Sequence, residues 1–291
     1  MPAVIGVATA IAALRGALAA GLDPDADPPR SVAPVSRGHL LLMPAEWDRY
    51  VGVKVASVAP ANPARGRARI QGRYLLLDSE TLTPLTVLDA VALTTVRTAA
   101  VSAVAVDALA EAGASRVVVF GTGPQARAHL EALRVVRPVE DVVVVGRDPG
   151  RTRSFAQETG ARVGTAEDVR DADLVVCCTT ASEPLFDGRL LAPHATVVAM
   201  GSHEPDVREV DDETVRRSTV VVESPGTALR EAGDVVLAVA AGVCDPAELV
   251  GLAAVVRGEA KPAVGAPRLF KSVGMAWEDL VVAAREYEEG A

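Results

Sequence analysis

The stretch Val117-Val-Val-Phe-Gly-Thr-Gly-Pro-Gln-Ala126 joins an apolar run to a helix-forming segment, Arg127–Arg134, through a glycine-rich turn. Gly121 permits the tight turn, Gly123 lets the backbone approach a bound group, and Ala126 allows the helix to pack closely on the strand. The N–H groups at the start of the helix favour an anion such as phosphate. This G-x-G-x-x-A turn therefore predicts a dinucleotide site, formed by Gly121, Thr122, Gly123, Pro124, Gln125 and Ala126.

Further apolar runs follow this stretch and alternate with helix-like segments. They are continuous rather than alternating, as expected for parallel strands that are covered on both faces. Repeated strand–helix units predict an α/β fold with a doubly wound parallel sheet of the Rossmann type. The expected strands are Val117–Phe120, Val142–Val145, Leu174–Cys178, Val197–Met200 and Val220–Val222.

The chain before this region has a different pattern. A helix is expected at residues 9–21, and a long helix rich in Ala, Val and Thr at residues 90–112. Four short strand-like runs lie between them and predict an antiparallel sheet in a second, α+β domain. These runs are His39–Met43, Tyr50–Val58, Arg69–Leu77 and Leu85–Leu88, and a final helix is expected at Trp277–Glu288.

Composition limits the class of protein. The 291 residues suit two domains, each of about 100–150 residues. Hydrophobic residues make up 49% of the chain, enough for a sizeable core, and the net charge is −9. A binder of nucleic acid or of an anionic membrane needs a basic face, so we expect neither partner. A small anionic ligand needs only two or three local cations.

Cysteine and histidine usage indicates the compartment and argues against a metal site. Cys177 and Cys178 are adjacent within an apolar run, which is typical of buried thiols in a reducing compartment. The four histidines lack the spacing of zinc ligands, and no metal is expected. The apolar N-terminal stretch has no basic leader, and Arg15 interrupts it. We expect a soluble cytoplasmic protein.

The second expected strand ends in residues that bear on cofactor choice. NAD enzymes usually place an acid there for the ribose 2′-hydroxyl, whereas this chain has Gly146 and then Arg147, with Arg151 nearby. Arginines suit a 2′-phosphate, so the sequence favours NADP(H). Asp148 keeps NAD(H) open, and Arg147 is otherwise an ordinary solvated loop cation.

Ligands of open parallel sheets bind at the carboxyl ends of the strands. Thr179 and Thr180 follow one expected strand, and Gly201-Ser202-His203 follows the next. The unperturbed pKa of histidine, near 6.5, suits proton transfer. We therefore expect Thr179, Thr180 and Gly201 beside the cofactor and His203 in the site.

Two cations stand out in the first part of the chain. Lys54 shares its strand face with the small residues Gly52 and Ala56, which leaves space around its ammonium, although a surface lysine would fit the same pattern. Arg97 is the only charge in its helical stretch, where burial requires an anion. That anion is either a protein carboxylate or a ligand carboxylate.

Taken together, the motifs resemble the ornithine cyclodeaminase/mu-crystallin family over nearly the whole chain. The resemblance implies a Rossmann domain at residues 114–268, inserted into a substrate-binding and dimerisation domain of residues 1–113 and 269–291. It also implies a homodimer. The segments that carry the resemblance are Leu42-Met-Pro44, Gly52-Val-Lys54, Asn62-Pro-Ala-Arg65, Leu75-Leu-Leu-Asp78, Arg97-Thr-Ala-Ala100, the Gly121 loop, Gly201-Ser-His-Glu-Pro-Asp206 and Ser272-Val-Gly274.

Within the family, Arg30, Lys54 and Arg97 match the residues that hold the substrate carboxylate, and Lys54 also matches a proton-transfer role. Gly274 matches a cofactor-binding position. Two positions depart from the cyclodeaminase pattern, because Leu41 and His203 stand where those enzymes have acids that handle the distal amine.

The resemblance therefore favours an NAD(P)H-dependent reductase of a cyclic ketimine carboxylate, with Lys54 and His203 as catalytic residues. The alternatives are an ornithine cyclodeaminase, a linear amino-acid dehydrogenase and a non-catalytic NADPH-dependent binder of small molecules.

Overall fold

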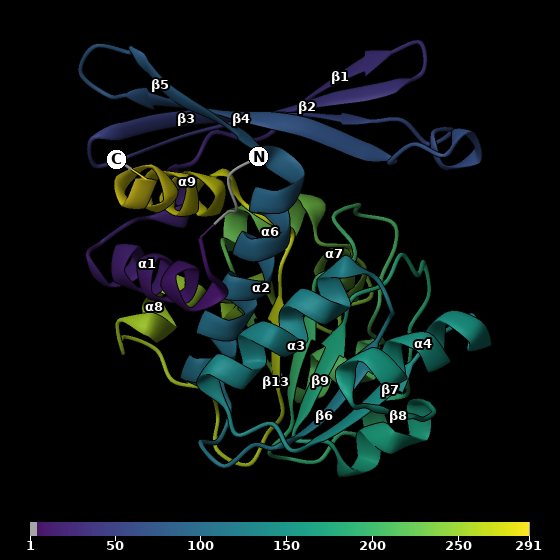
Figure 1. The fold of residues 1–291 in the computed structure, drawn as a ribbon. Coiled ribbons are helices and arrows are strands. Elements are labelled where there is room, and N and C mark those ends of the chain that lie inside the picture. The colour runs from purple at the N-terminus through teal and green to yellow at the C-terminus, as the bar shows by residue number, and fades with distance from the viewer. Residues whose placement is uncertain (1–4, 291) are drawn as a thin grey trace. The chain divides into compact units, whose positions relative to one another are not determined.

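The computed structural model describes residues 5–290, which form two compact units (Figure 1). Of the described residues, unit 1 consists of 5–101 with 275–290, and unit 2 is Ser102–Gly274. The fold class predicted from the sequence, a parallel α/β sheet with a separate antiparallel sheet, is confirmed.

Unit 1 is built on a five-stranded antiparallel sheet whose strands lie in chain order. Along the central strand, successive residues point to opposite faces of the sheet, and buried residues alternate with more exposed ones. The buried face carries Tyr50, Gly52 and Lys54. The helix α9 (Ala276–Gly290) packs on this face against three strands, and α1 (Val7–Ala19) packs against α9. The strands are β1 (Ser31–Val35), β2 (Gly38–Trp47), β3 (Tyr50–Val58), β4 (Ile70–Asp78) and β5 (Pro84–Asp89).

The helix α2 (Ala90–Leu109) begins in unit 1 and ends in unit 2. By length and composition it could cross a membrane, but 67% of its most apolar window is buried within the protein. Ala99, Ala100 and Val101 have no exposed surface. The helix therefore has the character of a core helix.

Unit 2 contains an eight-stranded parallel sheet in the order β12-β11-β13-β10-β9-β6-β7-β8. Its strands are β6 (Arg116–Phe120), β7 (Asp141–Val145), β8 (Arg162–Val163), β9 (Leu174–Cys177), β10 (Thr196–Ala199), β11 (Thr219–Val222), β12 (Val250–Gly251) and β13 (Arg268–Lys271). The helices are α3 (Pro124–Val136), α4 (Pro149–Thr159), α5 (Asp212–Arg217), α6 (Pro225–Glu231), α7 (Gly233–Ala240) and α8 (Leu252–Val256). Cys177 is buried at the end of β9, and Cys178 is half-buried.

The boundaries between the two parts differ from those expected at 113/114 and 268/269. Residues 269–274 belong to unit 2, because β13 pairs with β10 on one side and with β11 on the other. Phe270 and Leu269 have no exposed surface in this position. The last strand in the chain is therefore an internal strand of the parallel sheet, and the sequence pattern did not indicate this.

Candidate functional site

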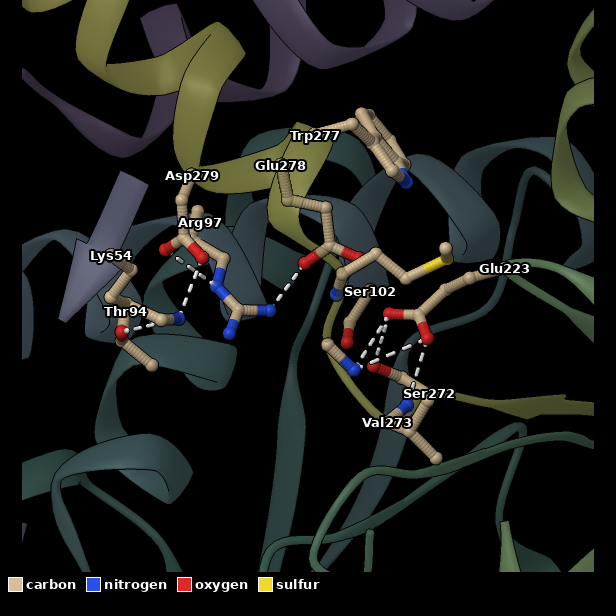
Figure 2. Close-up of polar contacts among 12 residues, drawn as sticks. Lys54, Thr94, Arg97, Ser102, Glu223, Ser272, Val273, Trp277, Glu278 and Asp279 are labelled. Carbon is tan, nitrogen blue, oxygen red and sulfur yellow. Dashed lines mark hydrogen bonds and ion pairs between the residues drawn. The ribbon is translucent and has the colours of Figure 1, made fainter. Parts of the chain in front are cut away.

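Unit 1 contains four buried charged side chains that contact one another, here called the buried charge cluster: Lys54, Arg97, Glu278 and Asp279. Lys54 Nζ lies 2.6 Å from Asp279 Oδ2 and 3.4 Å from Thr94 Oγ1. Arg97 pairs with Glu278, and its Nε lies 3.3 Å from Asp279 Oδ1. Figure 2 shows these side chains pointing toward one another from β3, α2 and α9.

The local sequence explains why Lys54 lies inside the unit. It lies opposite Met43 of β2 and Tyr74 of β4, on the face that α9 covers. A Cβ atom on Gly52 would lie 2.0 Å from the Tyr74 hydroxyl. Glycine at position 52 is therefore required for the ring of Tyr74 to pack beside Lys54.

Burial and the neighbouring charges shift the pKa of Lys54. Burial lowers its pKa to about 8, the charge of Asp279 opposes this effect, and the positive charges of Arg97 and Arg30 lower the pKa further. Arg30 is half-buried and lies close enough for its charge to act on Lys54. The structure therefore places Lys54 and Arg97, the two cations that stand out in the sequence, in one cluster, and Arg30, which the family resemblance adds, acts on Lys54 through its charge.

The sequence left the anion beside Arg97 open, and the structure supplies protein carboxylates. Glu278 and Asp279 have no exposed surface and lie in the first turn of α9. Sequence reasoning missed both residues. The available signal was the pair of adjacent acids in the otherwise uncharged stretch 275–284, since charges in such a stretch require partners when buried.

Two further groups belong to this region of unit 1. Asp27 accepts a hydrogen bond of 2.7 Å from the backbone N–H of Trp277, and burial raises its pKa to about 7, with Asp279 adding to the effect. Tyr74 is fully buried, and among residues 5–290 its hydroxyl has no hydrogen-bond partner. Burial and the charges of Asp279 and Asp27 raise the pKa of Tyr74, so its phenol stays neutral.

The glycine-rich turn lies in unit 2 between β6 and α3. Gly121 has a φ of 111°, and a Cβ atom there would lie 2.4 Å from the carbonyl oxygen of Cys178. Gly123 is the N-cap of α3, has no side-chain cap, and has open space where a Cβ would project. This turn fits the pyrophosphate of a dinucleotide. The backbone N–H groups at the start of α3 can bind an anion, and Gly123 has no side chain that would block its approach.

The end of β7 carries the residues expected to distinguish NADP(H) from NAD(H). Arg147 and Arg151 are exposed. Asp148 is the N-cap of α4, where its Oδ1 accepts a 2.9 Å hydrogen bond from the N–H of Arg151, and this bond lowers the pKa of Asp148. The carboxylate of Asp148 is therefore engaged in its own helix, whereas the two guanidinium groups face solvent.

Buried carboxylates hold the loops at the carboxyl edge of the parallel sheet. Glu209 accepts hydrogen bonds from the N–H and the hydroxyl of Thr179, at 2.8 and 2.7 Å, and from the N–H of Gly201 at 2.7 Å. Thr180 and His203 are exposed on these loops. The loop after β13 is fixed by Glu223, which accepts from Ser272, Val273 and Gly274 (Figure 2).

Comparison with known proteins agrees with this architecture. The family model described as "Ornithine cyclodeaminase/mu-crystallin family" matches residues 3–290. A Δ1-pyrroline-2-carboxylate reductase of Bacillus cereus is 34% identical over 263 residues, covering 86% of this chain and 81% of that protein.

Solved structures give the same result. The Δ1-pyrroline-2-carboxylate reductase of Thermococcus litoralis, in complex with NADH and L-proline, matches with a TM-score of 0.90 and 30% identity, over 99% of this chain and 94% of that one. An archaeal alanine dehydrogenase dimer with bound NAD matches with a TM-score of 0.91 and 27% identity, over 99% and 92% of the two chains.

Proposed function

The chain belongs to the ornithine cyclodeaminase/mu-crystallin family of NAD(P)-dependent oxidoreductases, and we propose that it reduces a cyclic ketimine carboxylate, such as Δ1-pyrroline- or Δ1-piperideine-2-carboxylate, to a cyclic amino acid. The observation that carries the proposal is the gathering of Arg30, Lys54 and Arg97 in unit 1. The Bacillus relative and the Thermococcus neighbour are named for reduction of Δ1-pyrroline-2-carboxylate, which supports the same substrate class.

The cations of unit 1 suit a monocarboxylate. Lys54 and Arg97 are buried beside the two acids of α9, and the positive charge of Arg30 acts on Lys54. A substrate carboxylate would be attracted by these positive charges. Arginine offers paired N–H donors that match a carboxylate, so Arg30 and Arg97 would also fix the orientation of the substrate.

Lys54 is the proposed proton holder. A ketimine accepts hydride readily only when its nitrogen is protonated, because the proton makes the neighbouring carbon electrophilic. With a pKa of about 8, the Lys54 ammonium is mostly charged at neutral pH, yet it gives up a proton more easily than an exposed lysine. His203 is a second proposed proton carrier, on the exposed loop after β10.

A nicotinamide nucleotide, when bound, supplies the hydride for this reduction. Residues 121–126 would hold its pyrophosphate, with Thr179, Thr180, Gly201 and Gly274 on neighbouring loops. We propose a preference for NADP(H), because Arg147 and Arg151 are exposed at the end of β7 while the Asp148 carboxylate caps α4.

The environment of Lys54 favours a substrate without a second amine. Leu41 lies opposite Ala56 and so shares the sheet face of Lys54, where cyclodeaminases have an acid. An apolar side chain at this position gives no partner to a distal ammonium, which disfavours ornithine. The second candidate is a linear amino-acid dehydrogenase, supported by the fold match with alanine dehydrogenase.

The first prediction concerns the reaction itself. With Δ1-pyrroline-2-carboxylate or Δ1-piperideine-2-carboxylate, we expect one NADPH to be oxidised per molecule of cyclic amino acid formed, measured by absorbance at 340 nm and amino-acid analysis. Ornithine without added reductant should release no ammonia. Ammonia and proline from ornithine alone would identify a cyclodeaminase, and reduction of pyruvate with ammonia would identify a linear dehydrogenase.

The second prediction concerns Lys54. The substitution Lys54→Met keeps the side-chain length but removes the proton and one carboxylate ligand, so we expect kcat/KM for the ketimine to fall by at least about 100-fold. Binding of NADPH, measured by fluorescence titration, should persist. The control is Lys261→Met, at an exposed position in unit 2. Activity of Lys54→Met equal to that of the control would remove Lys54 from the mechanism.

The third prediction concerns cofactor choice. A charge-assisted hydrogen bond contributes about 1.5–3 kcal/mol, so Arg147→Ala should raise the KM for NADPH by about 10- to 100-fold and leave the KM for NADH nearly unchanged. Arg153→Ala, at an exposed arginine on α4, is the matched control. Equal effects of Arg147→Ala on both nucleotides would contradict the proposed 2′-phosphate contact.

We also propose a homodimer formed through the face of the five-stranded sheet that α9 does not cover. Leu42 lies opposite Val55 on this face, and Val87 lies on the same face of β5. Their exposed fractions are 37%, 39% and 59%. Exposed apolar patches of this kind mark interfaces, and the alanine dehydrogenase neighbour is a dimer.

The fourth prediction tests this interface. Val55→Lys places a charge in the proposed contact, so we expect the molar mass from light scattering to fall from that of a dimer to that of a 30.0 kDa monomer. Val264→Lys, at a fully exposed position of unit 2, should leave the mass unchanged. A Val55→Lys protein that remains a dimer at micromolar concentration would place the interface elsewhere.

A further inference from the structure

Asp279 lies between the two buried cations of unit 1 and uses both of its carboxylate oxygens. Its Oδ2 is 2.6 Å from Lys54 Nζ, and its Oδ1 is 3.3 Å from Arg97 Nε. The side chain of Asp279 has no exposed surface. An acid therefore occupies the centre of a site proposed to bind an anion, and it needs a role other than binding the substrate.

We propose that Asp279 is a positioning residue for the reductase reaction: it keeps the ammonium of Lys54 charged and holds it beside the guanidinium of Arg97. The inference rests on the proposed function, because the proton held at Lys54 Nζ is the one that serves the ketimine nitrogen. Asp279 acts through Lys54 and gives no proton to the substrate itself.

The forces on Lys54 explain why an anion is needed. Burial in an apolar interior and the two neighbouring guanidinium groups, Arg97 and Arg30, all favour the neutral amine. Asp279 favours the ammonium through its charge and its hydrogen bond. Without that carboxylate, Lys54 would lose its proton at a lower pH and would no longer be fixed in direction.

Other groups near Lys54 come from every element packed around it. Arg97 stays charged over the whole working range, and the raised pKa of Tyr74 keeps that phenol neutral. Asp27 titrates near pH 7 and acts on Asp279. The polar and charged groups are Thr94 and Arg97 on α2, Tyr74 on β4, Glu278 and Asp279 on α9, and Asp27 and Arg30 in the segment before β1, while β2 presents the uncharged Met43.

The fifth prediction is a direct titration of Lys54. The chain has three lysines, Lys54, Lys261 and Lys271, so lysine labelled with ¹³C at Cε gives three NMR signals that substitutions at 54 and 261 assign. We expect Lys54 to titrate near pH 8 in the unmodified protein. In Asp279→Asn, which keeps the shape but not the charge, we expect the midpoint about 1–3 pH units lower. The exposed Lys261 is the internal control and should not move.

Two further variants separate charge from packing. Asp279→Glu keeps the carboxylate and should leave the Lys54 midpoint within about half a pH unit of the original. Asp27→Asn should change it less than Asp279→Asn does, because Asp27 acts on Asp279. If folded Asp279→Asn leaves the Lys54 midpoint unchanged, or if Asp279→Glu lowers it as much as Asn would, the inference is overturned.

The activity profile provides the link to the reaction. Activity requires protonated Lys54, so kcat/KM for the ketimine falls as the pH rises through its pKa. In Asp279→Asn this fall in kcat/KM, the alkaline limb of the pH profile, should move to lower pH together with the NMR midpoint. Activity should then recover when the pH is lowered below the new midpoint. Glu278→Gln removes a charge that contacts Arg97, and we expect a raised KM with a much smaller movement of the limb.

These measurements distinguish the inference from the proposed function. A folded Asp279→Asn protein whose activity falls by the same factor at every pH contradicts the positioning role. An unmodified protein that reduces no ketimine overturns the proposed function, whereas the NMR titration still decides whether Asp279 controls the charge of Lys54.

Discussion

The pairing of Lys54 and Arg97 with the two acids of α9 is the interaction on which unit 1 depends. A buried ammonium or guanidinium without a partner is too costly to keep, so β3 and α2 can carry these cations inside only when α9 packs beside them. Asp279 therefore joins the last helix of the chain to β3 of the antiparallel sheet, and Glu278 joins it to α2. These contacts connect the two ends of the sequence within unit 1.

Such a cluster is a poor means of stabilising a fold. Burial removes hydration from each charge, and the pairing returns little more than it costs, so apolar residues of equal volume would serve a purely structural core as well. In the proposed reaction, the role of the cluster is to keep Lys54 and Arg97 charged although both side chains are buried away from water. In unit 2, Glu209 and Glu223 fix the loops mainly through backbone N–H groups and hydroxyls, although a buried ion pair, Lys271–Asp234, is present there as well.

The sequence predicted those features that depend on local pattern. The turn at Gly121 was recognisable because the glycine spacing itself carries the geometry. The strand pattern left Lys54 open between a site and a surface position, and the resemblance to the family decided for the site. Asp279 was not recognisable as its partner, since the two residues are 225 positions apart and only tertiary packing joins them. No strand was expected at residues 268–271, and the place of β13 between β10 and β11 depends on the same kind of long-range packing. β1 escaped notice because its sequence, Ser31-Val-Ala-Pro-Val35, contains a proline and has no regular alternation of polar and apolar residues.

Two groups in or beside the buried charge cluster, Asp27 and Lys54, titrate near neutrality, so the charge of this region depends on pH. Asp27 has a pKa of about 7 and Lys54 a pKa of about 8, both displaced chiefly by burial. In the proposed reaction, loss of the Lys54 proton above pH 8 would weaken the attraction for a substrate carboxylate and would remove the proton that the ketimine nitrogen needs. Below pH 7 Asp27 becomes neutral, which removes a negative charge from this region and would strengthen its attraction for an anion. Burial acts in opposite directions on an acid and a base and is the largest cause of both shifts, while Asp279 opposes it at Lys54 and adds to it at Asp27.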